Sequence, residues 1–528
     1  MILYNGMIYT MDKGIIVEAI KIVDDKIVKL GNSEEILNLK QLNEECIDLA
    51  GKTVIPGFND SHMHLYGFGT TLEMVDLMNV TSIDDIINKV KNYIKNNKIN
   101  ENQWLQGRGW NQDYFKINKR FPTRDDLDKI SKKHPIILSR VCGHIAVVNS
   151  KALEVCNISE NTLDVEGGNF DINMGIFKEN ALSLIMDNIP KPSVIDIKNT
   201  LIKAMNYANS KGITSIHTDD LSHCGNYKYM LQAYEELNKE NKLTCRIYQQ
   251  CLLNKSQLKE FIELGYKTGV GDNYFKIGPL KVLSDGSLGA RTAALSKAYS
   301  DDKSTSGIMC YSNEELEDII TFAHENDMQI AIHCIGDRSM KIVLDCYEKV
   351  IKDRNYKRHG IIHCQIMDKI ILNKFKDIDI LAYIQPIFLH YDLHIVENRV
   401  GKELAKTSYA FKSMIDKGIH LSLGTDCPVE ICDPLVNIYC SVNRKDLQGF
   451  PQAGFNPQEN LSVHEAIYHY TQESAYASFE ENIKGSISED KLADLVVLTD
   501  NIFNISPIYI KDIKVLKTIV GGKVVYSM

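Results

Sequence analysis

The sequence predicts an α/β protein: a (β/α)8 TIM barrel with an insertion domain after its first strand and a small β-sandwich domain built from both chain termini. Three observations support this. Eight short apolar runs alternate with amphipathic stretches between residues 58 and 475, as in a parallel sheet covered by helices. The two chain ends contain short strand-like runs and no helix of useful length. Several apolar runs end in a polar residue, where barrel active sites are built.

Composition limits the classes of function. The chain has 528 residues, of which 44% are hydrophobic and 24% charged, and a net charge of -9. These values are typical of soluble globular proteins and argue against nucleic acid or an anionic membrane as the main partner. We therefore expect a small-molecule substrate, and a homodimer is one open possibility for the assembly.

Cysteine use and the N-terminal segment indicate the compartment. The 13 cysteines are odd in number and form no CxxC pair, which is typical of reduced thiols rather than a disulfide framework. The first residues carry no basic segment followed by an apolar run, and no stretch of about 18 apolar residues occurs later. We expect a cytoplasmic protein.

The chain ends each predict a group of strands. The N-terminal group is Met7–Met11, Ala19–Val23, Ile27–Leu30 and Thr53–Ile55, and the C-terminal group is Ala493–Leu498, Lys517–Val520 and Lys523–Tyr526. Either group alone is too small to bury a core. We therefore assign residues 1–57 and 476–528 to one composite β-domain, with two separate terminal modules as the alternative.

The middle of the chain, residues 58–475, predicts the barrel. Its expected strands are Phe58–His64, Ile213–Thr218, Arg246–Leu252, Phe275–Ser284, Gln329–Cys334, Gly360–Cys364, Ile380–Gln385 and His420–Thr425, with helices that include Leu316–Asn326 and Ser339–Lys352. The span of 418 residues exceeds the roughly 250 of a typical barrel. The excess lies in residues 66–205, which we expect to form an insertion that covers the barrel mouth as a lid.

Histidines at the end of the first strand suggest a metal site. His62 and His64 are two positions apart, so on a strand both imidazoles point to the same face. His333, His363 and Asp426 end three later strands. Singly, each could be a hydrogen-bonded core histidine or a helix-capping aspartate, but together the four imidazoles and one carboxylate are typical ligands of a divalent transition metal.

Lys281 lies in the fourth predicted strand, where a lysine that faces the barrel centre must be paired or lose its charge. It begins the string Lys-Val-Leu-Ser-Asp-Gly-Ser-Leu-Gly-Ala-Arg-Thr-Ala, and His333 begins His-Cys-Ile-Gly-Asp-Arg. With the order His-x-His, Lys, His, His, Asp, these strings resemble the amidohydrolase superfamily. The nearest branch is amidohydrolase family 3, which includes N-substituted formamide deformylase-like proteins, and the resemblance covers almost the whole chain.

The resemblance implies a site for two metals, expected to be zinc. Lys281 would be carboxylated on its side-chain nitrogen and bridge the ions, with His62 and His64 on one ion and His333 and His363 on the other. Asp426 would bind a metal and also accept a proton. An unmodified Lys281 beside a single metal is the alternative, because the superfamily varies at this position.

The expected reaction is hydrolysis of a C–N bond of an amide or formamide type. A zinc-type ion lowers the pKa of water from about 15.7 to about 7 and polarises a carbonyl, and Asp426 would act first as general base and then as general acid. The alternatives are a deaminase of a cyclic amidine or heterocycle and a regulatory homologue without catalysis. Superfamily deaminases usually carry a catalytic Glu between the fifth-strand and sixth-strand histidines, and this chain has no His-x-x-Glu there.

Substrate contacts are harder to predict. The candidates are polar or aromatic residues of the insertion or of strand ends, namely Trp110, His144, His217, Asp285, Arg291, Asp337 and Gln385. Four of them have a structural alternative. Trp110 could pack in a core, Asp285 and Arg291 could form an ion pair, and His217 could anchor a loop.

Overall fold

The computed structural model describes residues 1–528 as two compact units. Unit 1 comprises Met1–Phe68 and Val194–Met528, and unit 2 comprises Gly69–Ser193. Unit 2 falls within the predicted insertion of residues 66–205.

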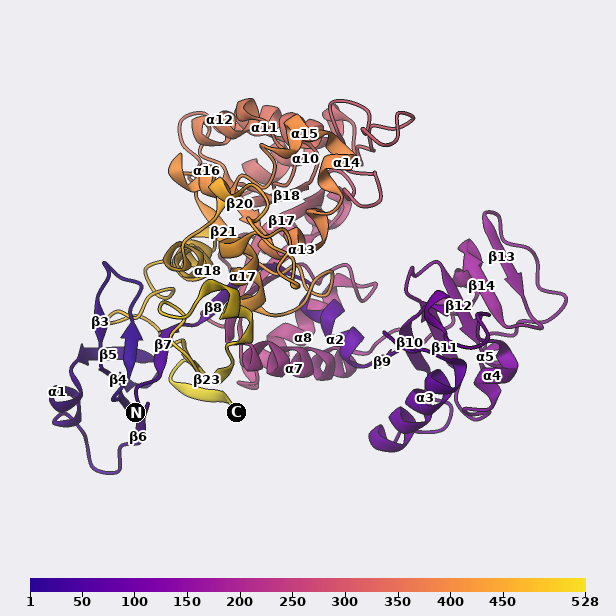
Figure 1. The fold of residues 1–528 in the computed structure, drawn as a ribbon, viewed down its shortest axis with the longest axis horizontal. Coiled ribbons are helices and arrows are strands. Elements are labelled where there is room, and N and C mark those ends of the chain that lie inside the picture. The colour runs from indigo at the N-terminus through magenta and orange to yellow at the C-terminus, as the bar shows by residue number, and fades with distance from the viewer. The chain divides into compact units, whose positions relative to one another are not determined.

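Unit 1 contains an eight-stranded parallel sheet, as predicted for the barrel (Figure 1). Its strands, in sheet order, are β8 (Phe58–Met63), β15 (Ile213–Thr218), β16 (Arg246–Leu252), β17 (Phe275–Leu283), β18 (Ile330–Cys334), β19 (Gly360–His363), β20 (Leu381–Ile384) and β21 (Leu421–Leu423). Each expected strand is present, and the bounds differ by up to two residues. The predicted TIM barrel fold is confirmed.

Polar contacts draw the first and last barrel strands together. Just beyond β21, the backbone N–H and the hydroxyl of Thr425 donate to the buried Asp60 carboxylate of β8 at 3.0 and 2.7 Å. The Asp426 N–H donates to the His62 carbonyl at 2.8 Å. These contacts place the ends of β8 and β21 side by side, although no ladder joins the two strands.

Helices connect the barrel strands. The α-helices of unit 1 after the insertion are α7 (Val194–Ser210), α8 (Tyr227–Lys239), α9 (Lys255–Glu263), α10 (Asn313–Glu325), α11 (Asp337–Val350), α12 (Lys369–Asp377), α13 (Leu389–Asp392), α14 (Val396–Val400), α15 (Lys402–Ala405), α16 (Phe411–Asp416), α17 (Pro434–Asn443) and α18 (Val463–Ala477). The 3-10 helices are η3 (Pro386–Phe388), η4 (Pro457–Glu459) and η5 (Pro507–Asp512). None of the helices combines the length and hydrophobicity that crossing a bilayer requires.

Local sequence fixes where several of these helices begin. Ser312 caps α10 by accepting from the Glu315 N–H at 3.2 Å, and the Glu315 carboxylate accepts from the Ser312 N–H at 2.9 Å. Ser462 and Glu465 form the same reciprocal pair at the start of α18. Each pair satisfies N–H groups that have no partner within the helix.

The chain termini form two further sheets in unit 1. One has the order β5 (Lys26–Gly31), β4 (Ala19–Val23), β1 (Ile2–Tyr4), β6 (Cys46–Asp48), and the other β24 (Lys523–Ser527), β23 (Val515–Val520), β22 (Leu495–Leu498), β7 (Thr53–Pro56), β2 (Met7–Tyr9), β3 (Ile16–Val17). The second sheet joins both ends of the chain through β7 and β22. Side chains of both sheets share one buried cluster that includes Leu3, Ile20, Leu495 and Ile519. A short helix, α1 (Ser33–Leu37), follows β5.

Unit 2 is built on a six-stranded sheet. Its order is β13 (Gly168–Asp171), β14 (Ile176–Glu179), β12 (Ile145–Val148), β11 (Ile136–Arg140), β10 (Leu105–Trp110), β9 (Val75–Asp76). Its helices are α3 (Ile83–Asn97), α4 (Arg124–Asp128), α5 (Ser150–Val155), α6 (Ser183–Met186), η1 (Gln112–Tyr114) and η2 (Asn180–Leu182), and α2 (Leu65–Leu72) spans the boundary with unit 1.

Both faces of the unit 2 sheet are buried. Along β11, Ile136 and Leu138 belong to one apolar cluster and Ile137 to another, as alternation along a strand requires. Unit 2 therefore has hydrophobic cores of its own.

Candidate metal centre

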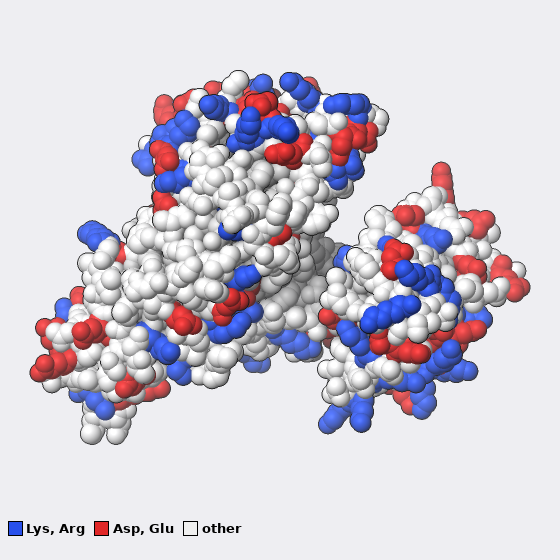
Figure 2. Space-filling view, in the orientation of Figure 1, with Lys and Arg blue, Asp and Glu red and all other residues white.

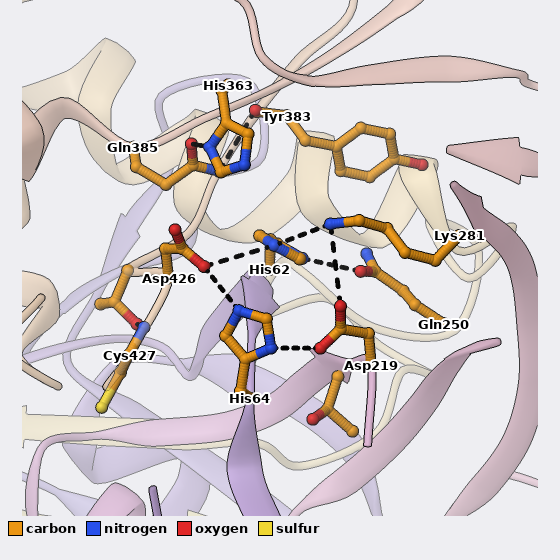
Figure 3. A network of polar contacts seen from close by, with 12 residues as sticks. His62, His64, Asp219, Gln250, Lys281, His363, Tyr383, Gln385, Asp426 and Cys427 are labelled. Atoms are coloured by element: carbon orange, nitrogen blue, oxygen red, sulfur yellow. Dashed lines mark hydrogen bonds and ion pairs between the residues drawn. The ribbon is translucent and has the colours of Figure 1, made fainter. Parts of the chain in front are cut away.

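The six predicted metal-site residues line one cavity of about 390 Å³ in unit 1. They come from five barrel strands or the residues just after them: His62 and His64, Lys281, His333, His363 and Asp426. The strands position them because all eight are parallel, so their carboxyl ends meet at the same end of the barrel. Figure 3 shows most of this cluster, with Asp426, His64 and Lys281 around His62.

Gln250, on β16, fixes the protonation of the His62 ring. The Gln250 side-chain N–H donates to the Ser61 carbonyl at 3.1 Å, so its oxygen faces the Nδ1 atom of His62 at 2.7 Å. That oxygen can only accept, and Nδ1 must therefore carry the proton. The Nε2 atom of His62 is left with a lone pair, which faces Nζ of Lys281 at 3.1 Å.

Gln385, which follows β20, does the same for His363. Its side-chain N–H donates to the Tyr383 carbonyl at 3.2 Å, and its oxygen accepts from Nδ1 of His363 at 2.7 Å. The Nε2 atom of His363 is therefore also an electron-pair donor. Gln385 was expected to contact substrate, and the structure places it instead as the partner of a predicted ligand.

Electron-pair donors converge on one point of the cavity. One ligand atom each of His62, His363 and Asp426 lie within 4.8 Å of one another, and all three residues are buried. The His62 Nε2 and Asp426 Oδ1 atoms are 3.4 Å apart. Neither atom carries a proton, because the His62 proton is on Nδ1 and the carboxylate is ionised, so two acceptors face each other. Burial raises the pKa of Asp426, but the contact with His64, whose own pKa is raised, outweighs burial and holds the pKa of Asp426 well below its usual range. Such a set of atoms fits a bound cation.

Asp219 is a candidate ligand that the sequence analysis missed. It follows β15, is fully buried and contacts Nδ1 of His64, and its Oδ2 atom lies 3.8 Å from Nζ of Lys281. Together with His62 and His64 it forms a second group of ligand atoms within 4.8 Å of one another. The signal was available, because Asp219 comes directly after an apolar strand that ends at Thr218. On this strand His217 was the predicted site residue instead.

His64 lies between two carboxylates. Its Nε2 atom is 2.9 Å from Asp426 Oδ1, and its Nδ1 atom contacts Asp219. Burial lowers the pKa of His64, but these two carboxylates outweigh it and raise the pKa to about 10. A positive charge at this position is thus favoured, whether a proton or a metal ion supplies it.

Lys281 is buried at the centre of the cluster. Its Nζ atom is 3.1 Å from Nε2 of His62. Burial lowers its pKa despite the nearby Asp219 and Asp426 carboxylates. A lowered pKa favours the neutral amine, which is the nucleophilic form.

His333 lies beside His363, with ring centroids 4.4 Å apart. Its Nε2 atom faces the Gly286 carbonyl at 3.1 Å, which leaves Nδ1 as the nitrogen for a ligand. His333 belongs to neither group of converging atoms, and the predicted division of histidines between two ions stays a prediction.

A sequence profile described as the amidohydrolase family matches residues 45–526. The chain belongs to the amidohydrolase family. YtcJ of Bacillus subtilis (strain 168), a protein named as an amidohydrolase, is 34% identical over 532 residues, which is 99% of each chain. An N-substituted formamide deformylase of Arthrobacter pascens is 24% identical over 548 residues, covering 100% of this chain and 98% of the relative. The crystal structure of an uncharacterized metal-dependent hydrolase from Pyrococcus furiosus is 31% identical with a TM-score of 0.80, covering 95% of this chain and 99% of that one.

Other predicted substrate contacts of the amidohydrolase have structural roles in unit 1. Asp285 accepts backbone N–H groups from Ile335 and Gly336 at 3.0 and 2.8 Å, which fixes the loop after β18. The alternative that Asp285 pairs with Arg291 is wrong, because the Arg291 guanidinium binds the Asp301 carboxylate at 2.9 and 3.1 Å.

His217 and Asp337 do not line the cavity of the amidohydrolase. His217 is buried against the Tyr248 ring with centroids 5.0 Å apart, and burial lowers its pKa to about 3. Asp337 begins α11, and its carboxylate accepts the Ser296 N–H at 2.9 Å. Neither is placed to contact a substrate in that cavity.

Trp110 and His144 belong to unit 2 of the amidohydrolase. Trp110 is fully buried in one core of that unit, and its indole N–H donates to the Leu138 carbonyl at 2.9 Å. Trp110 therefore packs in a core, which is the structural alternative to substrate contact. His144 is exposed, with Nδ1 2.9 Å from a Glu179 carboxylate oxygen, and its predicted substrate contact stays a prediction.

Proposed function

We propose that this protein is a metal-dependent amidohydrolase that hydrolyses an amide-type or formamide-type C–N bond of a small molecule. The convergence of His62, His363 and Asp426 carries the proposal, because their ligand atoms meet with fixed tautomers and no proton between them. Membership of the amidohydrolase family supports it.

The residues that would hold divalent ions are the six predicted metal-site residues in the cavity lining, together with Asp219. We propose two zinc-type ions, with one ion as the alternative. When bound, such ions make water acidic near neutral pH and polarise the scissile carbonyl. Gln250 and Gln385 hold His62 and His363 in orientation, as hydrogen-bond acceptors behind metal-binding histidines commonly do.

Lys281 is proposed to carry a carboxyl group. Its neutral amine would attack carbon dioxide, forming an N–C bond, while one N–H proton leaves to solvent. The product is an anionic carbamate, which can bridge two cations where an ammonium would repel them. Burial of Nζ and its lowered pKa support this assignment.

Asp426 is the proposed proton carrier. Its carboxylate lines the cavity and its pKa is held low, so it is ionised and able to accept a proton from the attacking water. It would then deliver this proton to the leaving nitrogen, which departs as an amine. Water thus adds to the carbonyl carbon, the C–N bond breaks, and the products are a carboxylic acid and an amine.

The structure does not favour the deaminase alternative. Asp337, the carboxylate between the fifth-strand and sixth-strand histidines that could replace a catalytic glutamate, is held by Ser296 and lies outside the cavity lining. No other observation supports attack on a cyclic amidine.

The test is a substrate panel. Protein loaded with zinc would be assayed with N-formyl amines, N-acyl amines and cyclic amidines, and an Asp426→Asn variant would serve as the control for contaminating activity. We expect release of amine from the amides, loss of it in the variant by about 100-fold or more, and no ammonia from the amidines. Deamination without amide hydrolysis would refute the proposal.

A further inference from the structure

The cavity that the proposed metal-site residues line contains a second set of polar residues. Gln365, Asp392 and Glu430 line it together with apolar side chains that include Leu288, Phe388 and Val429. None of these three polar residues belongs to either group of converging ligand atoms. They are therefore available to the part of a substrate that does not react.

Gln365 lacks a partner for its side chain. It follows β19, is 3% exposed, and its Oε1 atom is buried without a hydrogen bond. A buried amide oxygen left in this state costs about 1–3 kcal/mol, and buried polar groups of this kind are usually satisfied by a ligand or water. Its position in the cavity lining points to a bound molecule as that partner.

Asp392 and Glu430 place two carboxyl groups in the same cavity. Asp392 is 6% exposed and accepts one hydrogen bond, from the Tyr409 hydroxyl at 2.7 Å. The Tyr409 N–H also donates to the Gln365 carbonyl at 2.8 Å, so one tyrosine positions both residues. Glu430 pairs with His390 at 3.0 Å.

Positive charge in contact with these carboxylates is scarce. His390 is the one side chain that forms an ion pair with either of them, and no lysine or arginine does. Burial raises the pKa of Asp392 to about 6. This value is still below 7, so the carboxyl group is mostly ionised at neutral pH and above. Lys281 is the one lysine or arginine in the lining, and it lies in the metal-ligand cluster. His64 also lines the cavity, but Asp219 and Asp426 already pair with it, so no unpaired cation remains to bind a substrate carboxylate.

We propose that the non-reacting end of the substrate carries a protonated amine, which the Asp392 and Glu430 carboxylates and the unpartnered Gln365 amide oxygen bind. The apolar side chains that line the same cavity would contact a short hydrocarbon linker. This inference rests on the proposed amide hydrolysis, and it predicts an order of preference among amides of equal length.

Three matched formamides test the proposal. N-Formyl-1,5-diaminopentane ends in an ammonium, N-formylhexylamine in a methyl group, and 5-formamidopentanoate in a carboxylate. We expect kcat/KM to fall in that order, with a ratio of about 10-fold to 100-fold between the first and last, because charged hydrogen bonds contribute most to discrimination. Asp392→Asn should lower kcat/KM about 10-fold for the ammonium compound alone. The exposed Glu403→Gln serves as the matched control and should change none of the values.

A binding measurement separates this inference from the proposed function. Calorimetry on metal-free full-length protein would give the affinities of the same three compounds without turnover, for wild type, Asp392→Asn and Glu430→Gln. Tighter binding of the ammonium compound that both variants weaken supports the cation site, even if no compound is hydrolysed. Equal affinities, or preference for the carboxylate compound, would overturn the inference whether or not hydrolysis occurs. Hydrolysis of none of the amides would overturn the proposed function alone.

Discussion

The histidines of the cluster depend on neighbours that set which nitrogen faces the cavity. Gln250 and Gln385 each donate to a backbone carbonyl and accept from a histidine Nδ1 at 2.7 Å. This arrangement leaves Nε2 of His62 and His363 without a proton in the resting state. The lone pairs are thus present before any metal arrives, so the geometry favours binding.

A first prediction follows for Gln250. Gln250→Leu removes the acceptor for His62 and should lower zinc affinity by about 10-fold to 100-fold, while Gln250→Glu, which keeps an acceptor, should retain most of it. Zinc content after dialysis against graded concentrations of a chelator measures this. Gln249→Leu is the matched control, because Gln249 is equally buried on the same strand but bonds to the Thr218 carbonyl. Equal loss of zinc in Gln250→Leu and Gln249→Leu would show general destabilisation and would contradict a specific role for Gln250.

Three of the predicted metal-site residues could be found from the sequence because each follows an apolar run. His333, His363 and Asp426 stand at strand ends, where polarity is conspicuous. Asp219 was missed because the polar His217 precedes it on the same strand face. Gln250 was missed because it lies inside a strand. Its role depends on the hydrogen bond with His62 of β8, and spacing along the sequence does not reveal that contact.

At the scale of elements, the barrel strands were predicted closely because they are buried on both faces and contrast with the helices between them. The six-stranded sheet of unit 2 was not predicted. Its edge strands β9 and β13 are short, and their partners are set by contacts distant in sequence rather than by a local pattern. The short helices α13 to α15 also lack a periodic signal of useful length.

A second prediction concerns the segment after α18. Glu480 is buried and bonds to Lys276 and Lys484 at 2.7 Å, and Lys484 also donates to Ser215 of β15 at 3.0 Å. This network fastens the segment to the barrel. Glu480→Gln leaves two lysines without their carboxylate and should lower the free energy of unfolding by about 3 kcal/mol at neutral pH.

The pH dependence of that loss gives a further check. Burial raises the pKa of Glu480, but the two lysines outweigh it and lower the pKa from 4.5 to about 2. The carboxylate therefore stabilises the fold fully above pH 4.5, and this contribution disappears as the pH falls toward 2. Urea unfolding at pH 7 and pH 4 should show a smaller difference between wild type and variant at the lower pH. A difference that grows as the pH falls would show that another mechanism operates.

At the scale of the whole molecule, unit 2 has its own hydrophobic clusters and its own sheet. On the face shown in Figure 2, lysines and arginines are interspersed with acidic residues rather than gathered in a patch of one sign. The charges on this face thus give no reason to expect a polyanion to bind there.

A third prediction tests the proposed lid. Replacing residues 70–192 by a short flexible linker removes unit 2 but none of the metal-site residues, which all belong to unit 1. We expect zinc content to be preserved and kcat/KM to fall by at least about 10-fold, because a lid excludes water and completes the substrate site. Zinc analysis and steady-state kinetics measure the two effects, and circular dichroism checks folding. A folded, zinc-loaded variant with unchanged kinetics would rule out the lid.

The proposed two-metal centre depends on the charge that Lys281 carries. As a carbamate it would bridge two ions, and Lys281→Ala should lose at least one of them; as an ammonium it would repel cations, and the same change should leave metal content unchanged or raised.

Metal analysis of wild type and Lys281→Ala, purified side by side without chelator, therefore distinguishes the two states of Lys281. We predict two divalent ions per wild-type chain and one or none in the variant, with activity lost in parallel. An equal metal content in the two proteins would contradict the bridging carbamate.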